Sequence, residues 1–411
     1  MRPDGSKADL PSHVPVELVT NFDLWQSAGM EVDPFGTIRK LWDGPRAVYR
    51  GYLDGQQSTS HHGWLLTRSS DIIHALKDWE SFSSRGQGDF SSIIGESWPL
   101  GPSPLDPPEH GKYREILNHL FTPQALAVME GSIREHADTL IGQFLNSGRC
   151  EFLEDFARPF AIKIFMQLMG LPIEDYALVK DWEFGVLHQT DTVKREKATR
   201  ESVAYIRRLI RERNLAPAQD LISIGVHGKI DGRPLCEDEA LGLLYQMFLA
   251  GLDTVANTLA FIFRYIAQHP EQQVLLKTEP LLLRNAVEEF LRYFSVIVDT
   301  RVATRDMHYA GVSMKAGDRV MLPTMLAFDH SIDDPGTIDL RRKNANRHVA
   351  FGAGAHLCLG QYLARRELAV ALEAWIAKVP IFKVTPSTPQ RCHGGQVFGM
   401  EELHLDWSPP I

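Results

Sequence analysis

The chain has 411 residues, more than the roughly 250–300 at which one hydrophobic core usually stops growing, so its length allows two domains or one large domain. Hydrophobic residues make up 44% and charged residues 23% of the chain, and this balance excludes a disordered or collagen-like protein. Lysine and arginine number 43 against 52 aspartates and glutamates, and the resulting net charge of −9 argues against general nucleic-acid binding.

The cysteines and the apolar stretches predict a cytoplasmic protein. Four cysteines, at positions 150, 236, 358 and 392, form no CxxC pair, which favours a reducing compartment over a disulfide framework. Residues 1–10 are polar and charged and show no hydrophobic signal core, and about the first 20 residues are expected to be flexible. The longest apolar stretch, residues 240–252, is shorter than the ~20 residues that span a membrane, so no membrane insertion is expected.

The first predicted elements in the chain are strands. Residues 47–53 and 63–67 flank Asp54-Gly55 and predict a hairpin-like pair of strands. The following segment, residues 85–109, is rich in proline and glycine but also carries large apolar side chains. This composition favours a packed, functional loop over a disordered one.

Helical periodicity dominates the rest of the chain. Ser132 to Glu135 has the pattern of a capping box, and an apolar stripe follows through residue 144. Similar helical patterns cover about 200–213, 237–268, 271–294 and 360–378, and a second β-rich stretch covers 302–322. Because strands do not alternate with helices, a doubly wound parallel sheet is not expected. The predicted fold class is mainly α with small β-sheets.

Cys358 lies in a glycine-rich stretch, residues 351–360, directly before a predicted helix. A lone cysteine is more often a small buried hydrophobe than a ligand. A dinucleotide-binding loop is excluded because Leu357 takes the third glycine position and no βαβ context is present. The amides and dipole of a helix N-terminus favour the thiolate over the thiol. One exposed thiolate is what a single axial metal ligand requires.

A second unusual stretch, residues 247–257, is apolar but contains Gly251, Asp253 and Thr254. Glycine inside a helix costs about 1 kcal/mol relative to alanine, and an unpaired buried carboxylate is costly as well. One interpretation is a core helix in which Thr254 bonds the carbonyl four residues earlier. We favour a locally opened helix that presents a proton donor to a buried ligand. Further along, Glu289 and Arg292 share one helix face, which by itself is a weak signal.

Taken in their order along the chain, the three stretches resemble the motifs of the cytochrome P450 family of haem-thiolate monooxygenases. The patterns F-x-x-G-x-H-x-C-x-G, A-G-x-D-T and E-x-x-R are matched by Phe351, Gly354, His356, Cys358 and Gly360, by Ala250, Gly251, Asp253 and Thr254, and by Glu289 and Arg292. Residues 106–110 with Arg114, and residues 169–172, also match family features, so the resemblance covers nearly the whole chain. Among bacterial members, residues 252–363 are similar to the camphor hydroxylase group.

The resemblance implies one cytochrome P450 domain over residues 1–411, a triangular helical domain that encloses haem b. Cys358 would be the axial ligand of the haem iron, with Phe351 and Gly352 beside it. Asp253 and Thr254 would be the catalytic residues that manage protons. The other residues expected to bind the cofactor are Ala250 and Gly251 along the haem and His110, Arg114, Arg301 and His356 at its propionates. Glu289 and Arg292 would be structural.

The positions that resemble the family's substrate pocket are mostly apolar, as a hydrocarbon-like substrate requires. They are Trp98, Gln246, Met247, Ile297, Gln396 and Val397. Trp98 stands where camphor hydroxylases present a tyrosine hydroxyl to the substrate ketone, and tryptophan donates only through its ring N–H. The amides of Gln246 and Gln396 offer another means of orienting the substrate. We therefore expect hydroxylation of a terpenoid or norisoprenoid, such as an ionone-like enone, rather than of camphor.

The resemblance also implies redox partners, because the chain has no flavin or iron–sulfur motif. A [2Fe-2S] ferredoxin with its NAD(P)H-dependent reductase would supply electrons for the reaction with O2, and the enzyme would be a monomer. We expect Lys112, Arg114, Arg365 and Arg366 to form a basic patch that docks an acidic ferredoxin. The alternative is an ordinary solvated face.

Two other functions are compatible with a haem-thiolate protein. A peroxygenase would use H2O2 directly, but it would need no proton relay such as Asp253 and Thr254. A non-catalytic haem sensor would need the Cys358 loop but would have no reason to keep Gly251, Asp253 and Thr254. The monooxygenase is therefore the favoured prediction.

Overall fold

The structure, a computed structural model, describes residues 10–25, 27–50, 62–86, 88–328, 332–386, 388 and 390–409. The chain divides into two compact units, each assembled from three segments. Unit 1 comprises Met1–Arg85, Glu288–Cys358 and Gln390–Glu401, and unit 2 comprises Gly86–Val287, Leu359–Pro389 and Glu402–Ile411. The single domain expected from the sequence stays a prediction.

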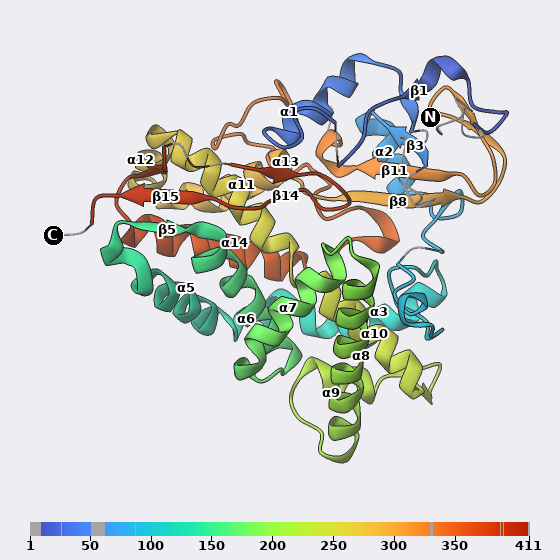
Figure 1. The fold of residues 1–411 in the computed structure, drawn as a ribbon, viewed down its shortest axis with the longest axis horizontal. Coiled ribbons are helices and arrows are strands. Elements are labelled where there is room, and N and C mark those ends of the chain that lie inside the picture. Colours follow the sequence, from blue (N-terminus) through green and yellow to red (C-terminus); the bar gives the residue numbers. More distant parts are fainter. Residues whose placement is uncertain are drawn as a thin grey trace. The chain divides into compact units, whose positions relative to one another are not determined.

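Unit 1 contains a six-stranded mixed sheet (Figure 1). Its strands, in spatial order, are β1 (Val19–Thr20), β2 (Ala47–Arg50), β3 (Gly63–Leu66), β11 (Arg319–Pro323), β8 (Val298–Ala303) and β4 (Phe82–Ser83). β2 and β3 pair antiparallel, with Ala47 opposite Leu66, so the strand pair predicted from the sequence is confirmed. Its predicted turn at Asp54-Gly55 lies outside the described residues. β11 runs parallel to β3 and antiparallel to β8.

The second predicted β-rich stretch is also confirmed. β9 (Met307–Tyr309) and β10 (Val312–Met314) form a hairpin between β8 and β11. Ala310, with φ 51°, and Gly311, with φ 82°, turn this hairpin in the left-handed region. Of the N-terminal segment expected to be flexible, residues 1–9 lie outside the described residues, and Val19–Thr20 pairs in parallel with β2.

The remaining elements of unit 1 are short, except for a helix that enters it from unit 2. They are α1 (Pro34–Arg39), α2 (Ser69–Lys77), α13 (Leu283–Tyr293), β13 (Cys392–His393) and β14 (Gly399–Met400). In α13, Arg292 donates two 2.8 Å hydrogen bonds to the Glu289 carboxylate, and both side chains are buried. Arg342 adds a 3.0 Å bond from Nε to Glu289 Oε1. This pairing suits the structural role that the sequence suggested for Glu289 and Arg292.

Unit 2 is mainly helical. Its helices are α3 (Glu109–Asn118), α4 (Pro123–Ala127), α5 (Glu130–Phe144), α6 (Arg158–Met169), α7 (Tyr176–Leu187), α8 (Thr192–Leu215), α9 (Leu221–Val226), α10 (Glu237–Ala250), α11 (Thr254–Gln268), α12 (Pro270–Thr278) and α14 (Gln361–Lys378). α7 packs along α8, and α14 packs along α5 (Figure 1). α11 is central because it contacts α6, α12 and α14, and nearly its whole length is buried.

Two small sheets complete unit 2. β12 (Phe382–Val384), β15 (His404–Trp407) and β5 (Arg149–Glu151) form one sheet, and β6 (Lys229–Ile230) and β7 (Arg233–Pro234) form the other. An aromatic cluster beside the first sheet includes Phe152 stacked on Phe263, with ring centroids 4.4 Å apart, and Trp375 edge-on to both. The predicted fold class, mainly α with small sheets, is therefore correct.

Three sequence predictions for unit 2 have different outcomes. The capping box at Ser132 is wrong, because α5 begins at Glu130 and the Ser132 hydroxyl donates to the Met129 carbonyl at 2.9 Å instead. The apolar stripe that follows is correct, since its members are all buried. The packed loop expected over 85–109 is also confirmed, since Ile94 and Trp98 belong to the hydrophobic core of unit 2.

The helix predicted over residues 237–268 is two helices, α10 and α11, separated at residues 251–253. Taken together, Glu237–Gln268 is long and apolar enough to cross a membrane by length and composition alone. However, 72% of its most apolar window is buried inside the protein. Such burial is typical of a core helix.

Candidate functional site

Cys358, the last residue of unit 1, stands at the end of a loop whose shape depends on glycine. Cys358 N donates to the Phe351 carbonyl at 2.8 Å, which closes the loop. Gly352 and Gly354 have φ of 73° and 72°, in the left-handed region that other residues rarely adopt. A Cβ on Gly354 would also lie 2.9 Å from the Lys77 Cα at the end of α2. The loop therefore holds Cys358 exposed, three residues before the first residue of α14.

Arg301 on β8 is the clearest sign of an anion site in unit 1. Its side chain is buried, and Nη1 donates to Asp299 Oδ1 at 2.6 Å and to the Thr300 carbonyl at 2.7 Å. Arg301 Nε is buried and has no hydrogen-bond partner among the described residues. A buried guanidinium donor without a partner is costly, so this arginine fits an anionic group such as a haem propionate.

Other residues of unit 1 that the sequence assigned to the site make contacts within that unit. His356 Nε2 lies 3.2 Å from Ser84 Oγ. Ile297 and Val397 form an isolated antiparallel bridge, and Val298 N donates to the Gln396 carbonyl at 2.8 Å. The structure thus brings the three expected pocket residues of this unit, Ile297, Gln396 and Val397, together.

In unit 2, the helix interruption expected at Gly251 is present. α10 ends at Ala250 and α11 begins at Thr254. A Cβ on Gly251 would lie 2.1 Å from Phe165 Cδ2 of α6, so close packing requires glycine here. Gln246, Ala250 and Thr254 follow at four-residue spacing and are less buried than most of their neighbours, whereas Met247 is buried in the core.

Asp253, at the interruption, is buried and lies in a small charged cluster. Its Oδ1 accepts a 2.6 Å hydrogen bond from Asn257 Nδ2, and its Oδ2 lies 3.3 Å from His188 Nε2. His188 Nε2 lies 3.1 Å from Glu183 Oε1. Burial opposes a charge on His188, but the Asp253 and Glu183 carboxylates outweigh it and raise the pKa of His188 to about 10. Burial, helped by the Asp253 charge, raises the pKa of Glu183.

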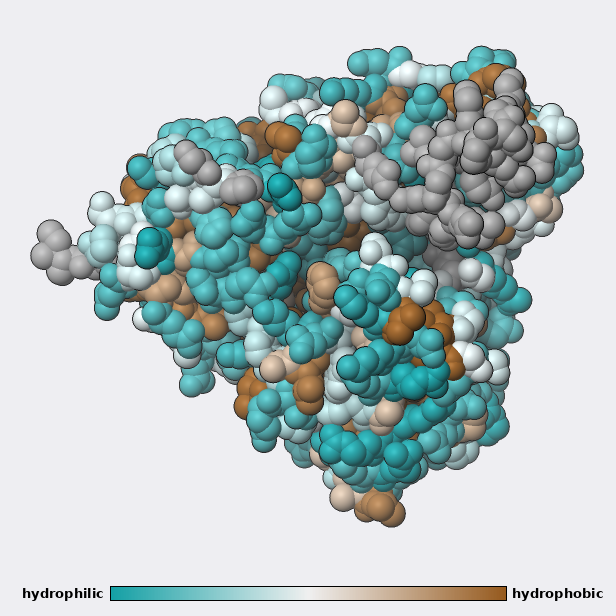
Figure 2. Space-filling view, in the orientation of Figure 1, coloured by the Kyte–Doolittle hydropathy of each residue, from teal (hydrophilic) through white to brown (hydrophobic). Residues whose placement is uncertain are grey.

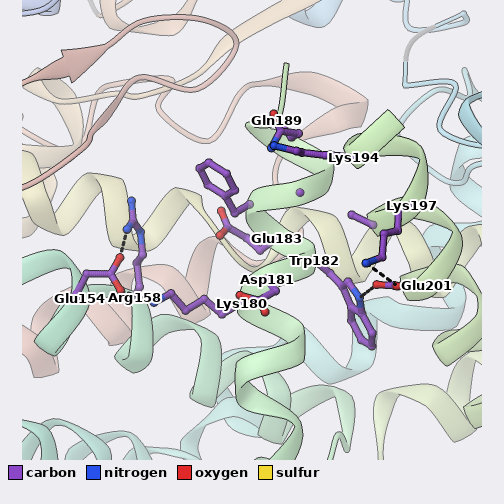
Figure 3. A pocket seen from close by; sticks show the side chains of 13 residues that line it. Glu154, Arg158, Lys180, Asp181, Trp182, Glu183, Gln189, Lys194, Lys197 and Glu201 are labelled. Carbon is purple, nitrogen blue, oxygen red and sulfur yellow. Dashed lines mark hydrogen bonds and ion pairs between the residues drawn. The ribbon is translucent and has the colours of Figure 1, made fainter. Parts of the chain in front are cut away.

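Glu183 also reaches an open surface pocket of about 640 Å³ beside α7 and α8 (Figure 3). The pocket is lined by charges of both signs, among them Arg158, Lys180 and Lys194. Arg158 and Lys180 both pair with Glu154. The surface over α8 is correspondingly hydrophilic for most of its length (Figure 2).

Trp98 is buried in the core of unit 2 and packs edge-on against Tyr245, with ring centroids 5.3 Å apart. Its Nε1 is buried and has no hydrogen-bond partner among the residues that the structure describes. It does lie close enough to Glu96 to help lower the pKa of that carboxyl, although Arg207 is the main cause. The indole N–H is thus a buried donor that a ligand could use.

The remaining cationic side chains that were expected to bind a propionate or to dock a ferredoxin are on α3 and α14. His110, which is buried, and Arg114 lie four residues apart on α3, so they share one face of that helix. Lys112, also on α3, pairs with Asp231 at 2.6 Å, and Arg366 on α14 pairs with Glu130. Two members of the expected basic patch are therefore neutralised locally.

Sequence patterns missed Glu183 and His188. Nothing in their spacing relates them to Asp253, 65 residues beyond His188 in the chain. The one available signal was a carboxylate in the apolar stretch 182–187, where burial without a partner would be costly.

Comparisons with known proteins agree with these features. A family model described as Cytochrome P450 matches residues 187–391. Probable cytochrome P450 127A1 of Sinorhizobium fredii (strain NBRC 101917 / NGR234) is 37% identical over 406 residues, which cover 97% of each chain. The polyketide biosynthesis cytochrome P450 PksS of Bacillus subtilis (strain 168) is 31% identical and covers 85% of this chain and 90% of its own. The crystal structure of CYP101J2 has a TM-score of 0.85 at 31% identity, covering 98% of this chain and 100% of its own.

Proposed function

The chain belongs to the cytochrome P450 family and is a P450 monooxygenase, and from this premise we propose that it hydroxylates a small apolar terpenoid or norisoprenoid. The reaction would consume O2, two electrons and two protons, and yield an alcohol and water. We further propose a cytoplasmic monomer that receives its electrons from a [2Fe-2S] ferredoxin and its NAD(P)H-dependent reductase. Family membership implies a haem-thiolate cofactor.

The residues present fit that cofactor. Cys358 offers an exposed thiol on a loop fixed by left-handed glycines, and Phe351 and Gly352 form the same turn. Arg301, with its buried unpartnered Nε, suits a propionate, and His110, Arg114 and His356 would complete the cationic partners. Ala250 and Gly251 would also border the haem. When bound, the haem supplies oxygen activation and insertion of one oxygen atom into a C–H bond.

Asp253 and Thr254 would deliver protons. Thr254 is the first residue of α11, so its hydroxyl lies at an interrupted turn rather than in the middle of a continuous helix. Asp253 Oδ1 is held by Asn257, while Oδ2 faces His188. A carboxylate with one oxygen anchored and the other beside a protonatable group would be able to accept a proton and pass it on.

One observation supports the small apolar substrate most directly. Within unit 2, Gln246 and Ala250 lie four residues apart on α10 and are less buried than most of their neighbours. Within unit 1, Ile297 bridges Val397 beside Gln396. Each set combines apolar groups with one amide, which suits a hydrocarbon-like substrate with few polar groups. The names of relatives do not decide the size of the substrate, since they include a polyketide biosynthesis enzyme and a vitamin D3 dihydroxylase.

The test is a titration of the ferric holoenzyme with a panel of ligands, in which the haem spin-state shift measures binding. Ionones and monoterpenoid ketones should give shifts at lower concentration than fatty acids or macrolides. Product analysis with a reconstituted ferredoxin and reductase should then show one added oxygen atom. Tight shifts only with fatty acids or macrolides would reject the proposed substrate class.

A further inference from the structure

Glu183, His188 and Asp253 form what we call the α7–α11 cluster. Glu183 lies in the last turns of α7, His188 directly follows that helix, and Asp253 directly precedes α11. One potential ligand atom from each residue lies within 4.8 Å of the other two. All three residues belong to unit 2, and the two carboxylates are 4% and 7% exposed.

The cluster has more negative charge than its own residues can balance. One imidazole nitrogen cannot donate its single hydrogen to two carboxylates at once. His188 Nε2 makes its hydrogen bond with Glu183 Oε1 at 3.1 Å. The buried Asp253 Oδ2 lies 3.3 Å from the same nitrogen but has no hydrogen-bond partner in the part of the chain that the structure describes. When both carboxylates are ionised, even a charged imidazole leaves one negative charge over, and burial makes that charge costly unless a proton or a cation balances it.

Two of the cations that line the adjoining pocket form ion pairs with another carboxylate. Arg158 and Lys180 both pair with Glu154 (Figure 3). Asn257 contributes only a neutral amide, to Asp253 Oδ1. A cation from solvent would therefore complete the cluster.

Geometry and ligand type select the kind of cation. Ligand bonds of about 2.0–2.1 Å in a tetrahedral zinc site place the ligand atoms roughly 3.3 Å apart. The separations from His188 Nε2 to the two carboxylate oxygens, 3.1 and 3.3 Å, match this spacing. One imidazole with two carboxylates suits Zn²⁺ better than Ca²⁺ or Mg²⁺, which prefer oxygen ligands alone. The open pocket at Glu183 gives water a route to a fourth position.

We propose that Glu183, His188 and Asp253 bind one zinc ion, and that this ion inhibits turnover. The metal binds the neutral imidazole, so its entry releases the imidazole proton to solvent. It occupies Asp253 Oδ2 and ties the end of α7 to the start of α11. Binding itself is independent of the proposed function, whereas inhibition rests on the proton-delivery role proposed for Asp253.

Binding is measured by equilibrium dialysis of Zn²⁺ against the ferric holoenzyme in a Cys236→Ser background, which removes an exposed thiol. We expect one ion per chain, and a loss of affinity of at least tenfold in both Glu183→Gln and His188→Gln. The matched control is His404→Gln, because His404 Nε2 also lies 3.1 Å from a glutamate, Glu402, but within a partly exposed pair of one imidazole and one carboxylate. This control should retain full affinity.

A second readout does not depend on activity. Zinc should slow amide hydrogen exchange at residues 184–189 in the parent protein and not in His188→Gln, whose folding is checked by circular dichroism. The site is rejected if the ion does not bind, if the two cluster variants bind as tightly as the parent, or if His404→Gln loses as much affinity as they do. Any of these results would mean that the cluster is neutralised by a proton or that zinc binds elsewhere.

The inhibition arm uses NAD(P)H-driven turnover, with the reductase and ferredoxin assayed separately for their own response to zinc. Turnover by the parent should fall as the site fills, while His188→Gln should show a zinc response weakened by at least tenfold. If zinc binds at the cluster and turnover is unchanged, the proton-delivery role of Asp253 is wrong while the site stands. If zinc does not bind, the site is wrong and the proposed function is untouched.

Discussion

Trp98 lies buried against Tyr245, and its indole N–H is the one polar group it can offer a ligand. A phenol at this position would present a hydroxyl from a smaller ring. Specificity for a ketone therefore becomes testable at a single side chain, provided that the two variants compared have nearly the same shape.

Trp98→Tyr should bind an ionone-like ketone more tightly than Trp98→Phe. The two variants differ by one hydroxyl, and one hydrogen bond is worth about 0.5–1.5 kcal/mol, or about 2- to 12-fold in the dissociation constant. Spin-state titration measures the difference. A hydrocarbon without a carbonyl should bind both variants equally, and equal binding of the ketone would show that residue 98 does not contact the substrate oxygen.

Glu367 on α14 gives a prediction about stability and pH. The side chain is buried, and burial raises its pKa well above the ordinary value of 4.5. The folded chain therefore holds a proton that the unfolded chain releases, so this group's stabilising contribution is complete below about pH 4.5 and is lost as the pH rises towards the folded-state pKa. Glu367→Gln, which cannot ionise, should gain stability relative to the parent as the pH rises from about 5 to 8.

Urea unfolding at several pH values measures this gain. Glu373→Gln is the matched control on the same helix, because Glu373 is about half exposed and pairs with Arg134. The control should show no such pH-dependent gain. Parallel pH profiles for Glu367→Gln and the parent would contradict the prediction.

Among the elements, the Cys358 loop depends on two glycines for different reasons. Both Gly352 and Gly354 are left-handed, but a Cβ on Gly352 would meet its nearest atom at 3.7 Å, whereas one on Gly354 would lie 2.9 Å from Lys77 Cα. Glycine is thus required at 352 only by the backbone conformation, whereas at 354 it is also required for the loop to pack on α2.

Gly352→Ala should cost about 1–2 kcal/mol, the usual cost of a left-handed conformation for an L-residue. Gly354→Ala should cost more, because the loop must also move away from α2. Thermal unfolding of the ferric protein measures both costs, and the reduced carbon-monoxide spectrum reports whether the thiolate ligand is kept. Equal effects from the two substitutions would mean that the α2 contact is not tight in solution.

Sequence patterns predicted where helices lie in the chain better than they predicted the residues at which helices begin or the side chains that they contact. Amphipathic stripes located α5, α8 and α14 because burial of one helix face leaves a periodic trace in the sequence. The capping box at Ser132 failed because an isolated four-residue pattern also fits inside a helix whose first turn starts earlier. The contact between His188 and Asp253 could not be predicted from the sequence pattern, since it depends on how α7 packs and not on local spacing.

At the scale of the whole molecule, the net charge of −9 makes any basic face the natural target of an acidic ferredoxin. Lys112 and Arg366 contribute little to such a face, because Asp231 and Glu130 lie against them. Lys112→Glu and Arg366→Glu should each change the KM for ferredoxin by less than about twofold, as expected for exposed paired charges. Arg365→Glu should raise it several-fold.

Steady-state NAD(P)H oxidation at increasing ferredoxin concentration measures these constants. The effect of Arg365→Glu should shrink as salt is added, because surface charges are screened over about 10 Å at 0.1 M ionic strength. A large rise with Lys112→Glu, or a salt-independent loss with Arg365→Glu, would place the docking face elsewhere.

The pairing of β15 with β5 determines when this sheet can form during translation. Leu405 lies opposite Cys150, so β5 is made long before the strand that pairs with it. Ribosomes add about 5–20 residues per second, so β5 stays unpaired for roughly 13–50 s after it is made. The C-terminal strand also closes its sheet between β12 and β5, so a chain cut just before His404 would leave both without their shared neighbour. Unit 2 can therefore complete this sheet only after residues 404–407 have been made, so a break in the chain between β12 and β15 should expose two unpaired strand edges.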